Sequence, residues 1–291
     1  MTKIMVDSTC DLPEELLKKY DIKIFPLRVL IENKEYIDKV DIQVDEVYKA
    51  MRKGILPKTS QPNPKDIYNM FNEYCAKGED FIFIAFSSVM SGTYQLAEAI
   101  MKEFKERYPH INMTVIDSQG GSTATGLIAR NAAILAEQPG QTFENLVKNI
   151  EAMVESIEHV FTISDLNWMI KGGRISRAQG IIGNMMDIKP ILDVNNGYME
   201  VIKKVRGRKK ALNTVVDILE QRTAGLTDQI IGISHADDLE TAEELIKLIK
   251  SRVGCSNFIV NKIGSVLGSH LGIGGVGIFF FNGNVDRSLI R

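Results

Sequence analysis

Short apolar runs alternate with longer amphipathic segments along almost the whole chain. The apolar runs predict strands at Lys3–Val6, Ile22–Leu30, Phe81–Phe86, Met113–Ile116, His159–Ile163, Gln229–Ile233, Phe258–Ile263 and Gly277–Phe281. Apolar positions at helical spacing predict helices at Pro13–Tyr20, Pro64–Lys77, Gly92–Arg107, Ser122–Ala136, Phe143–Ile157, Lys209–Arg222 and Leu239–Val253. Strands that alternate with helices indicate α/β layers with much parallel sheet.

The pattern of residues along the chain changes between Gln138-Pro139-Gly140 and Ile163. The first series of strands and helices ends there, and glycines become frequent afterwards. We therefore predict two α/β lobes, residues 1–158 with a largely parallel sheet and residues 159–291, with a ligand held in the cleft between them.

Composition narrows the possible classes of partner. The 291 residues carry 35 Lys and Arg against 37 Asp and Glu, a net charge of -2, so there is no general electrostatic reason to bind nucleic acid or an anionic membrane. The chain begins without a signal-peptide pattern, and no apolar run has the length of a membrane span. Cys10, Cys75 and Cys255 are far apart and odd in number, which favours reduced thiols. We expect a cytoplasmic protein with at most transient membrane contact.

Small polar residues cluster where predicted strands end. The four clusters are Asp7–Asp11, Thr59–Pro62, Ser87–Thr93 and Asp117-Ser118. The carboxyl edge of a parallel sheet is where α/β proteins bind ligands. The clusters therefore favour a shared site, provided that they do not merely cap helices.

Capping is the ordinary alternative for each cluster. Asp11 precedes a predicted helix, Asn63 before Pro64 has the pattern of an N-cap with proline at the first helical position, and Ser91 is a candidate cap of the next helix. For any one cluster taken alone, a helix cap is the better explanation than a ligand site. Four of them, together with His270, favour a convergent site.

His270 lies in Gly264–Gly272, which we interpret as a glycine-rich loop between two apolar strands. Glycine permits close approach of a ligand, and histidine adds a titratable hydrogen-bonding group. Ser91 and Thr93 stand at a predicted helix N-terminus, where free backbone N–H groups attract anions. Hydroxyls and amides without lysine or arginine suit a carboxylate better than a polyphosphate.

Several catalytic and cofactor motifs are excluded. Gly272–Gly277 has the spacing G-x-G-x-x-G but leads into a strand, so it does not bind a dinucleotide. The chain has no P-loop, no G-x-S-x-G elbow, no H-E-x-x-H and no cluster of His and Cys. We therefore expect no cofactor and no metal. His110, His159 and His235 are isolated, and we interpret them as structural or exposed.

Two basic runs remain. Lys171–Arg177 is a loop with glycines in which Arg174 is placed to meet a phosphate or an acidic partner at the mouth of a cleft. Lys203–Lys210 is too local for a nucleic-acid surface but suits the orientation of a docking partner. The alternative for both is a solvated turn.

Taken together, these motifs resemble the DegV family of bacterial fatty-acid-binding proteins. The matching segments, in family order and spacing, are Asp7–Asp11, Thr59–Pro62, Ser88–Tyr94, Gly173–Ser176, Lys189–Ile191 and Gly264–His270. The resemblance extends from Val6 to about Phe281. The chain departs from the usual pattern at Met90, where leucine is more usual, and at Leu271–Gly275, where Thr-Gly-Pro-Gly is common.

The resemblance implies two α/β lobes that enclose one long-chain fatty acid, such as palmitate or oleate, with its carboxylate at the lobe junction. It also implies that the chain is not catalytic and presents this acid to a separate ATP-dependent kinase of the dihydroxyacetone-kinase type, which forms an acyl phosphate for phospholipid synthesis. By family analogy, the carboxylate-binding residues fall on Thr59 or Ser60, on Ser91 or Thr93, and on His270. The arginine associated with phosphorylation or kinase contact falls on Arg174.

Two other functions stay open. An acyl hydrolase or transferase would use Ser91 or another hydroxyl with His270, although the missing elbow weighs against it. A regulatory adaptor would signal lipid occupancy to a partner. Apolar residues that either line a tunnel or form the core, with the core favoured, are Phe25, Phe161, Ile163, Ile188 and Phe279 to Phe281.

Overall fold

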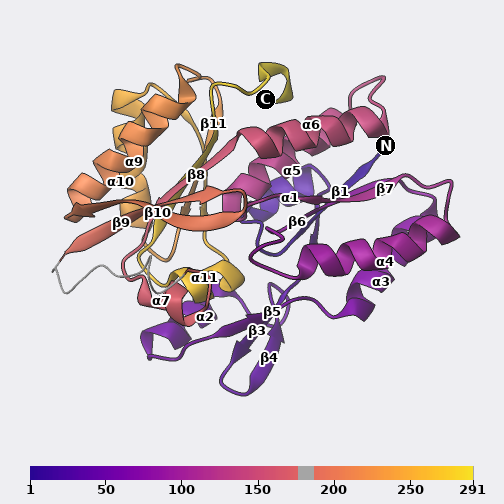
Figure 1. Cartoon of the computed structure of the whole chain (residues 1–291), viewed down its shortest axis with the longest axis horizontal. Helices are drawn as coiled ribbons and strands as arrows, with labels where there is room; N and C mark the ends of the chain where they lie inside the picture. Colours follow the sequence, from indigo (N-terminus) through magenta and orange to yellow (C-terminus); the bar gives the residue numbers. More distant parts are fainter. Residues whose placement is uncertain (176–186, 291) are drawn as a thin grey trace.

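The computed structural model describes residues 1–175 and 187–290, and Figure 1 shows the whole chain. One sheet has the order β2-β1-β6-β7, and all its neighbours are parallel, as the sequence predicts. Its strands are β1 (Lys3–Asp7), β2 (Lys23–Phe25), β6 (Phe81–Ala85) and β7 (Met113–Asp117). Its helices are α1 (Glu14–Lys19), α3 (Pro64–Lys77), α4 (Thr93–Arg107), α5 (Ser122–Ala136) and α6 (Phe143–Ser156).

Strand β6 explains why this sheet carries helices on both faces. All five of its residues are buried. Phe81 and Phe83 pack into the core cluster that includes residues of α3 and α4, whereas Ile82 and Ile84 pack into the cluster beneath α5 and α6. A parallel sheet buried on both faces requires such a continuous apolar run.

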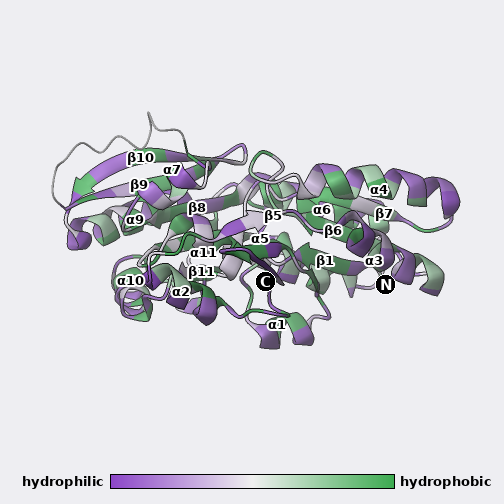
Figure 2. Cartoon of the chain, turned by 90° about the horizontal axis from the view of Figure 1, so that it is seen from below, coloured by the Kyte–Doolittle hydropathy of each residue, from purple (hydrophilic) through white to green (hydrophobic). Residues whose placement is uncertain are grey.

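The second sheet has six strands in the order β10-β9-β8-β13-β11-β12. Its strands are β8 (Ile157–Thr162), β9 (Ile188–Asn195), β10 (Tyr198–Arg206), β11 (Ile230–His235), β12 (Asn257–Lys262) and β13 (Val276–Phe281). Only the pair β11 and β12 is parallel among its described neighbours. One face packs on α9 (Arg208–Thr223) and α10 (Leu239–Arg252). Figure 2 shows α4 and α10 carrying both hydrophobic and hydrophilic residues, as helices that cover a sheet do.

The opposite face of this sheet packs toward α5, which also covers β1. Phe279 and Phe281 of β13 share a core cluster with Leu127 and Ile128 of α5 and with Val6 of β1. Helix α5 therefore lies between the two sheets. The predicted division between residues 158 and 159 stays a prediction, and it falls inside β8.

A small third unit lies at the bottom of Figure 1. Strands β3 (Arg28–Ile31), β4 (Lys34–Ile37) and β5 (Lys58–Ser60) form an antiparallel sheet in the order β4-β3-β5. Helices α2 (Val44–Arg52), α7 (Asn167–Lys171) and α11 (Ser265–Leu271) lie near this sheet. The short helix η1 (Arg287–Leu289) is the last element of the described chain. Val29, Val47 and Val266 share one core cluster, so this unit joins the beginning of the chain to its end.

The prediction of one strand over Ile22–Leu30 is wrong. The chain forms β2 and β3 instead, in different sheets, with Pro26 between them. Proline lacks the N–H that a continuous ladder needs, and the amide of Leu27 instead donates to Oγ of Ser8 (3.1 Å). Sequence reasoning also missed α2, α7, β4, β5, β9 and β10. Strand β10 is half-exposed along its length and ends in lysines and arginines, so its pattern resembles a solvated charge run.

The prediction of a loop at Gly264–Gly272 is also wrong, because residues Ser265–Leu271 form α11. Gly264 and Gly272 lie at the two ends of this helix, the latter with φ of 80°. Inside the helix, position 268 needs a glycine, because a Cβ there would lie 2.6 Å from Oη of Tyr48. The glycines thus bring α11 against α2, and His270 is held by regular structure.

Candidate ligand cavity

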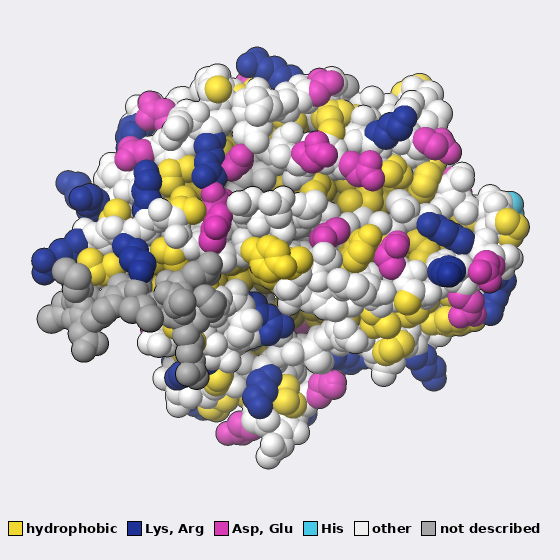
Figure 3. Space-filling model, in the orientation of Figure 1, with side chains coloured by type: hydrophobic (Ala, Val, Ile, Leu, Met, Phe, Trp, Pro, Cys, Tyr) yellow, Lys and Arg dark blue, Asp and Glu magenta, His cyan; other side chains and the backbone are white. Residues whose placement is uncertain are grey.

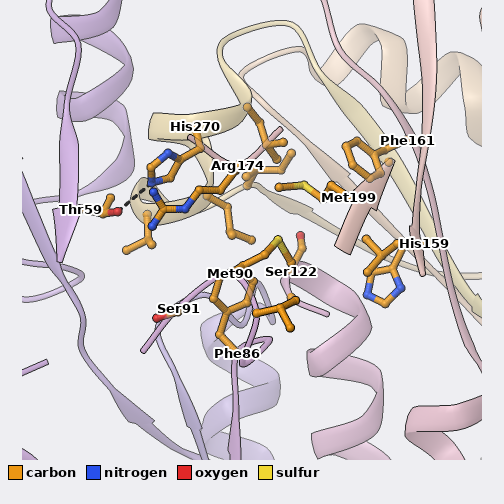
Figure 4. Close-up of a pocket in the computed structure, with 18 of the residues that line it drawn as sticks. Thr59, Phe86, Met90, Ser91, Ser122, His159, Phe161, Arg174, Met199 and His270 are labelled. Atoms are coloured by element: carbon orange, nitrogen blue, oxygen red, sulfur yellow. Dashed lines mark hydrogen bonds between the residues drawn. The ribbon is translucent and has the colours of Figure 1, made fainter. Parts of the chain in front are cut away.

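A cavity of about 580 Å³ lies where the three units meet, within the usual size range of small-molecule sites. Its wall is apolar over most of its length, with Phe86, Met90, Phe161, Met199 and Phe279 among the lining residues. Thr59, Arg174 and His270 lie close together at one end in Figure 4, and Ser122 and His159 are polar members of the remaining wall. The wall is therefore amphipathic along the cavity.

Thr59 and His270 are in direct contact. Thr59 stands on β5, opposite Val29 of β3, and its Oγ1 lies 2.7 Å from Nε2 of His270 on α11. The adjacent Ser60 also lines the cavity but is exposed at its rim. Of this predicted hydroxyl pair, Thr59 is the one that contacts the histidine.

The imidazole of His270 is neutral at neutral pH. Burial lowers its pKa to about 4, and the nearby positive charge of Arg174 acts in the same direction. Its Nδ1 has no hydrogen-bond partner within the described part of the chain. A Cβ at Gly172 would lie 2.3 Å from this atom, so the glycine makes room for the ring. A neutral imidazole can donate one hydrogen bond and accept one.

Ser91 and Thr93 are bonded to each other at the start of α4. The Ser91 and Thr93 hydroxyl oxygens are 2.9 Å apart, and the Thr93 amide donates to Ser91 Oγ (3.3 Å). Ser91 lines the cavity, whereas Thr93 is fully buried behind it. The prediction that Ser91 is the N-cap is wrong by one position, because Gly92 holds that place. Asn63, by contrast, caps α3 as predicted, and its Oδ1 accepts from the Lys65 amide (2.9 Å).

Arg174 brings a positive charge to the polar end. It follows α7 through a tight turn in which Gly173 has φ of 69°, and its Nη1 donates to the carbonyl of Gly172 (2.6 Å). Among the described residues that line the cavity, Arg174 is the one charged side chain. Ser176 and Arg177, which belong to the predicted motif, lie outside the described residues.

The acidic members of the predicted clusters support loops and do not line the cavity. Asp7 accepts hydrogen bonds from Thr9 and from the amide of Phe86, and burial raises its pKa. Asp11 does not cap α1, which begins after Pro13; it accepts from Ser122 Oγ (2.6 Å) and the Gly264 amide (2.9 Å). These buried aspartates therefore fix the backbone or side chain of Phe86 and Ser122, which line the cavity.

The basic run Lys203–Lys210 stands apart from this cavity. It covers the end of β10 and the start of α9, and lysine and arginine side chains gather over these elements on the left of Figure 3. No residue of this run is among the described residues that line the cavity.

The arrangement does not form a Ser-His catalytic pair from the predicted residues. The Ser91 hydroxyl is bonded to Thr93, and the described contact of the imidazole is with Thr59. A nucleophilic site also needs a third group that orients the histidine, and Nδ1 has none within residues 1–175 and 187–290.

Metal chemistry has no ligand set in the described residues either. Among the described residues, no three His, Cys, Asp or Glu side chains lie together in a group that could hold a metal ion. The three cysteines are buried and free. None of the described helices has the length and apolar character needed to cross a bilayer.

The apolar residues that the sequence left between tunnel wall and core, with the core favoured, divide in the structure. Phe161, Ile163 and Phe279 line the cavity, whereas Phe25, Phe280 and Phe281 belong to the packed core. His159 also lines it, although we interpreted this residue as structural or exposed. The one signal in the sequence is the alternation of side chains along a strand: His159 and Phe161 are two positions apart, so they point to the same face of β8.

The fold and the cavity define a two-lobed α/β protein with an amphipathic ligand site. The model of the DegV family, described as an uncharacterised protein family, matches residues 1–283, and the chain belongs to this family. It is 35% identical over 280 residues to a DegV domain-containing protein of Clostridium perfringens, covering 95% of this chain and 96% of that protein. It is 33% identical to the fatty acid-binding protein of Thermotoga maritima, covering 94% and 96%.

Solved structures agree in fold. A stearic acid-binding protein from Eubacterium ventriosum superposes with a TM-score of 0.89 at 27% identity, covering 97% of this chain and 99% of that chain. A fatty acid-binding DegV protein from Thermus thermophilus gives 0.86 at 28% identity, with the same coverage. Members of the DegV family thus bind fatty acids.

Proposed function

We propose that this chain binds one long-chain fatty acid, with the carboxylate at Thr59, Ser91 and His270, near Arg174, and the hydrocarbon tail along the apolar wall. The observation that carries the proposal is a mostly apolar wall in which Thr59 and His270 are in contact at one end with the cation of Arg174 beside them. A carboxylate is costly to bury without partners, and these groups supply them. The fatty acids bound by relatives support the same ligand class.

The tail supplies most of the binding free energy in this proposal. A sixteen-carbon acid has about fourteen methylenes, and at ~0.8 kcal/mol for each the gross gain is about 11 kcal/mol. Loss of translational and internal freedom takes back several kcal/mol. The polar end therefore chiefly orients the ligand and satisfies its charge.

Thr59, Ser91 and His270 are the groups we assign to the carboxylate. Thr59 and His270 already share a hydrogen bond, and Ser91 lines the same cavity. Thr93 supports Ser91 from behind, and Ser60 lies at the exposed rim. The proposal thus selects one hydroxyl from each pair, Thr59 and Ser91, because these two lie nearer to the polar end or inside the cavity.

We further propose that the chain is not itself an enzyme and that a separate cytoplasmic kinase phosphorylates the bound acid. A carboxylate oxygen is the nucleophile for transfer of a γ-phosphoryl group, and the kinase would supply ATP and magnesium. Two observations support a separate kinase: the sequence lacks a nucleotide-binding motif, and Arg174 lies beside the proposed carboxylate site. The cation would stabilise charge as the acyl phosphate forms.

Mass spectrometry of the purified protein tests the first proposal. After denaturation and organic extraction, we expect one long-chain fatty acid per chain, and delipidated protein should take up palmitate or oleate. Persistent absence of lipid with no uptake of either acid would overturn it.

A reconstituted reaction with a dihydroxyacetone-kinase-like fatty acid kinase and ATP tests the second. Arg174→Ala should keep bound lipid but form acyl phosphate much more slowly. Arg107→Ala, which removes an exposed arginine paired with Glu103 at the end of α4, is the matched control and should behave as wild type. Equal loss of lipid binding and phosphorylation in Arg174→Ala would place this residue in lipid binding alone.

A further inference from the structure

Part of the cavity wall is a two-stranded ladder that changes from small to large residues. Gly275 precedes β13, Gly277 and Phe279 belong to it, and all three line the cavity. Gly277 is paired with Phe161 of β8, and Phe279 is paired with His159 of the same strand. Alternate residues of a strand point to the same face, so two positions without a side chain are followed by a phenyl ring.

This order leads away from the polar end of the cavity. Leu271, next to His270 at the end of α11, also lines the cavity, and Gly275 follows it closely in the chain. Figure 4 shows His159, the partner of Phe279, across the cavity from His270. An acyl chain with its carboxylate at the polar end therefore passes the glycines first and reaches Phe279 last.

The cavity ends at Phe279. The next pair of the ladder on this face is Phe281 with Ile157, and neither is among the described residues that line the cavity. Both belong to the packed core cluster that contains Leu127 of α5. Phe279 belongs to the same cluster and is only 5% exposed, so its ring separates the cavity from the core.

The ring of Phe279 leans back along the strand, over Gly277. Its Cζ lies 3.2 Å from the place that a Cβ at position 277 would take. An edge-to-face contact with His159, with the centroids 5.7 Å apart, fixes the ring. His159 is itself packed against Gly120, where a Cβ would lie 2.1 Å from Nε2. Close-packed surroundings of this kind resist the insertion of further methylene groups.

We propose that Phe279 is a specificity-determining residue that stops the acyl chain and sets the greatest chain length that the protein accepts. This inference rests on the proposed function, because it requires the carboxylate at the polar end. Each methylene that enters the apolar cavity should raise the affinity about fourfold. Once the tail meets the ring, a further methylene must stay outside or distort the packed wall, so the affinity should stop rising and then fall.

The test measures the dissociation constants of the saturated acids from laurate to arachidate on delipidated protein, by displacement of a fluorescent fatty acid. We expect the affinity to rise with length, pass through a maximum and fall. Phe279→Leu should move the maximum to longer acids and bind the first acid that is too long for wild type about tenfold more tightly. Gly277→Ala adds a methyl group that presses on the ring, so it should move the maximum to shorter acids.

Phe280→Leu is the matched control. It makes the same change at the next residue of β13, which packs into the core cluster on the other face of the sheet and is not among the described residues that line the cavity. It should lower the stability and leave the length maximum in place. Thermal unfolding confirms that each variant is folded, and Gly277→Ala tests the stop independently if Phe279→Leu does not fold.

The outcomes separate this inference from the proposed function. The role of Phe279 is overturned, while fatty acid binding stands, if the acids bind without a length maximum or if the maximum stays in place in both Phe279→Leu and Gly277→Ala. It is also overturned if Phe280→Leu moves the maximum as Phe279→Leu does. If none of the acids binds to the folded wild-type protein, the proposed function fails as well.

Discussion

The hydroxyl of Thr59 lies 2.7 Å from Nε2 of His270, although the two residues are 211 positions apart in the chain. Thr59 is the middle residue of β5 in the small sheet, and His270 stands in the last turn of α11. This contact joins an early and a late segment at the polar end of the cavity. It also fixes the orientation of a ring whose other nitrogen lacks a partner among the described residues.

Removal of the Thr59 hydroxyl should weaken ligand binding. Thr59→Val keeps the shape of the side chain but loses the hydrogen bond, so we expect palmitate affinity to fall about tenfold. Displacement of a fluorescent fatty acid measures the change. Ser60→Ala, at the exposed rim, is the control and should have little effect; equal losses in the two variants would argue against a specific role for Thr59.

The buried histidines predict how stability changes with pH. Burial lowers the pKa of His159 and of His270 to about 4 from an ordinary value of 6.5. The unfolded chain therefore takes up protons first as the pH falls, and the stability that depends on the neutral rings is present above about pH 6.5 and lost toward pH 4. Asp11 acts in the opposite direction, because burial raises its pKa to about 6.

Comparison of variants separates these contributions. The free energy of unfolding of His159→Phe, measured in urea, should fall about 2 kcal/mol less than that of wild type between pH 6.5 and pH 4. Parallel curves for the two proteins would show that His159 is not neutral in the folded state.

Gly268 should not tolerate a side chain. A Cβ there would lie 2.6 Å from Oη of Tyr48, which donates to the carbonyl of Ile263 (2.8 Å). We expect Gly268→Ala to destabilise the protein by about 1–3 kcal/mol, because α11 or Tyr48 must move. Adding Tyr48→Phe removes the clashing oxygen and should recover part of the loss. An additive double variant would contradict the steric explanation.

Gly120 lies against His159, across the cavity from Thr59 and His270, and a substitution there tests whether this part of the wall matters for binding. A Cβ there would lie 2.1 Å from Nε2 of His159, so Gly120→Ala should displace the imidazole and weaken palmitate binding. The double variant with His159→Ala removes the clash and should bind palmitate more tightly than Gly120→Ala alone. Calorimetry measures both, and no recovery in the double variant would show that the loss arises elsewhere.

Much of the architecture could be predicted because its causes are local. The continuous apolar run of β6 and the Asn63-Pro64 cap of α3 act within a few residues. Helix α11 was misjudged because its glycines are explained by a distant partner, Tyr48. The place of His159 in the cavity wall could not be predicted either, because the cavity is built from segments far apart in the sequence.

A crystal structure of the protein with palmitate measures the central claim most directly. We expect the carboxylate oxygens within hydrogen-bond distance of Thr59 and His270 and near Arg174, with the tail running past Phe161 toward His159. A carboxylate at the His159 end, or a fatty acid bound outside this cavity, would contradict the proposed site.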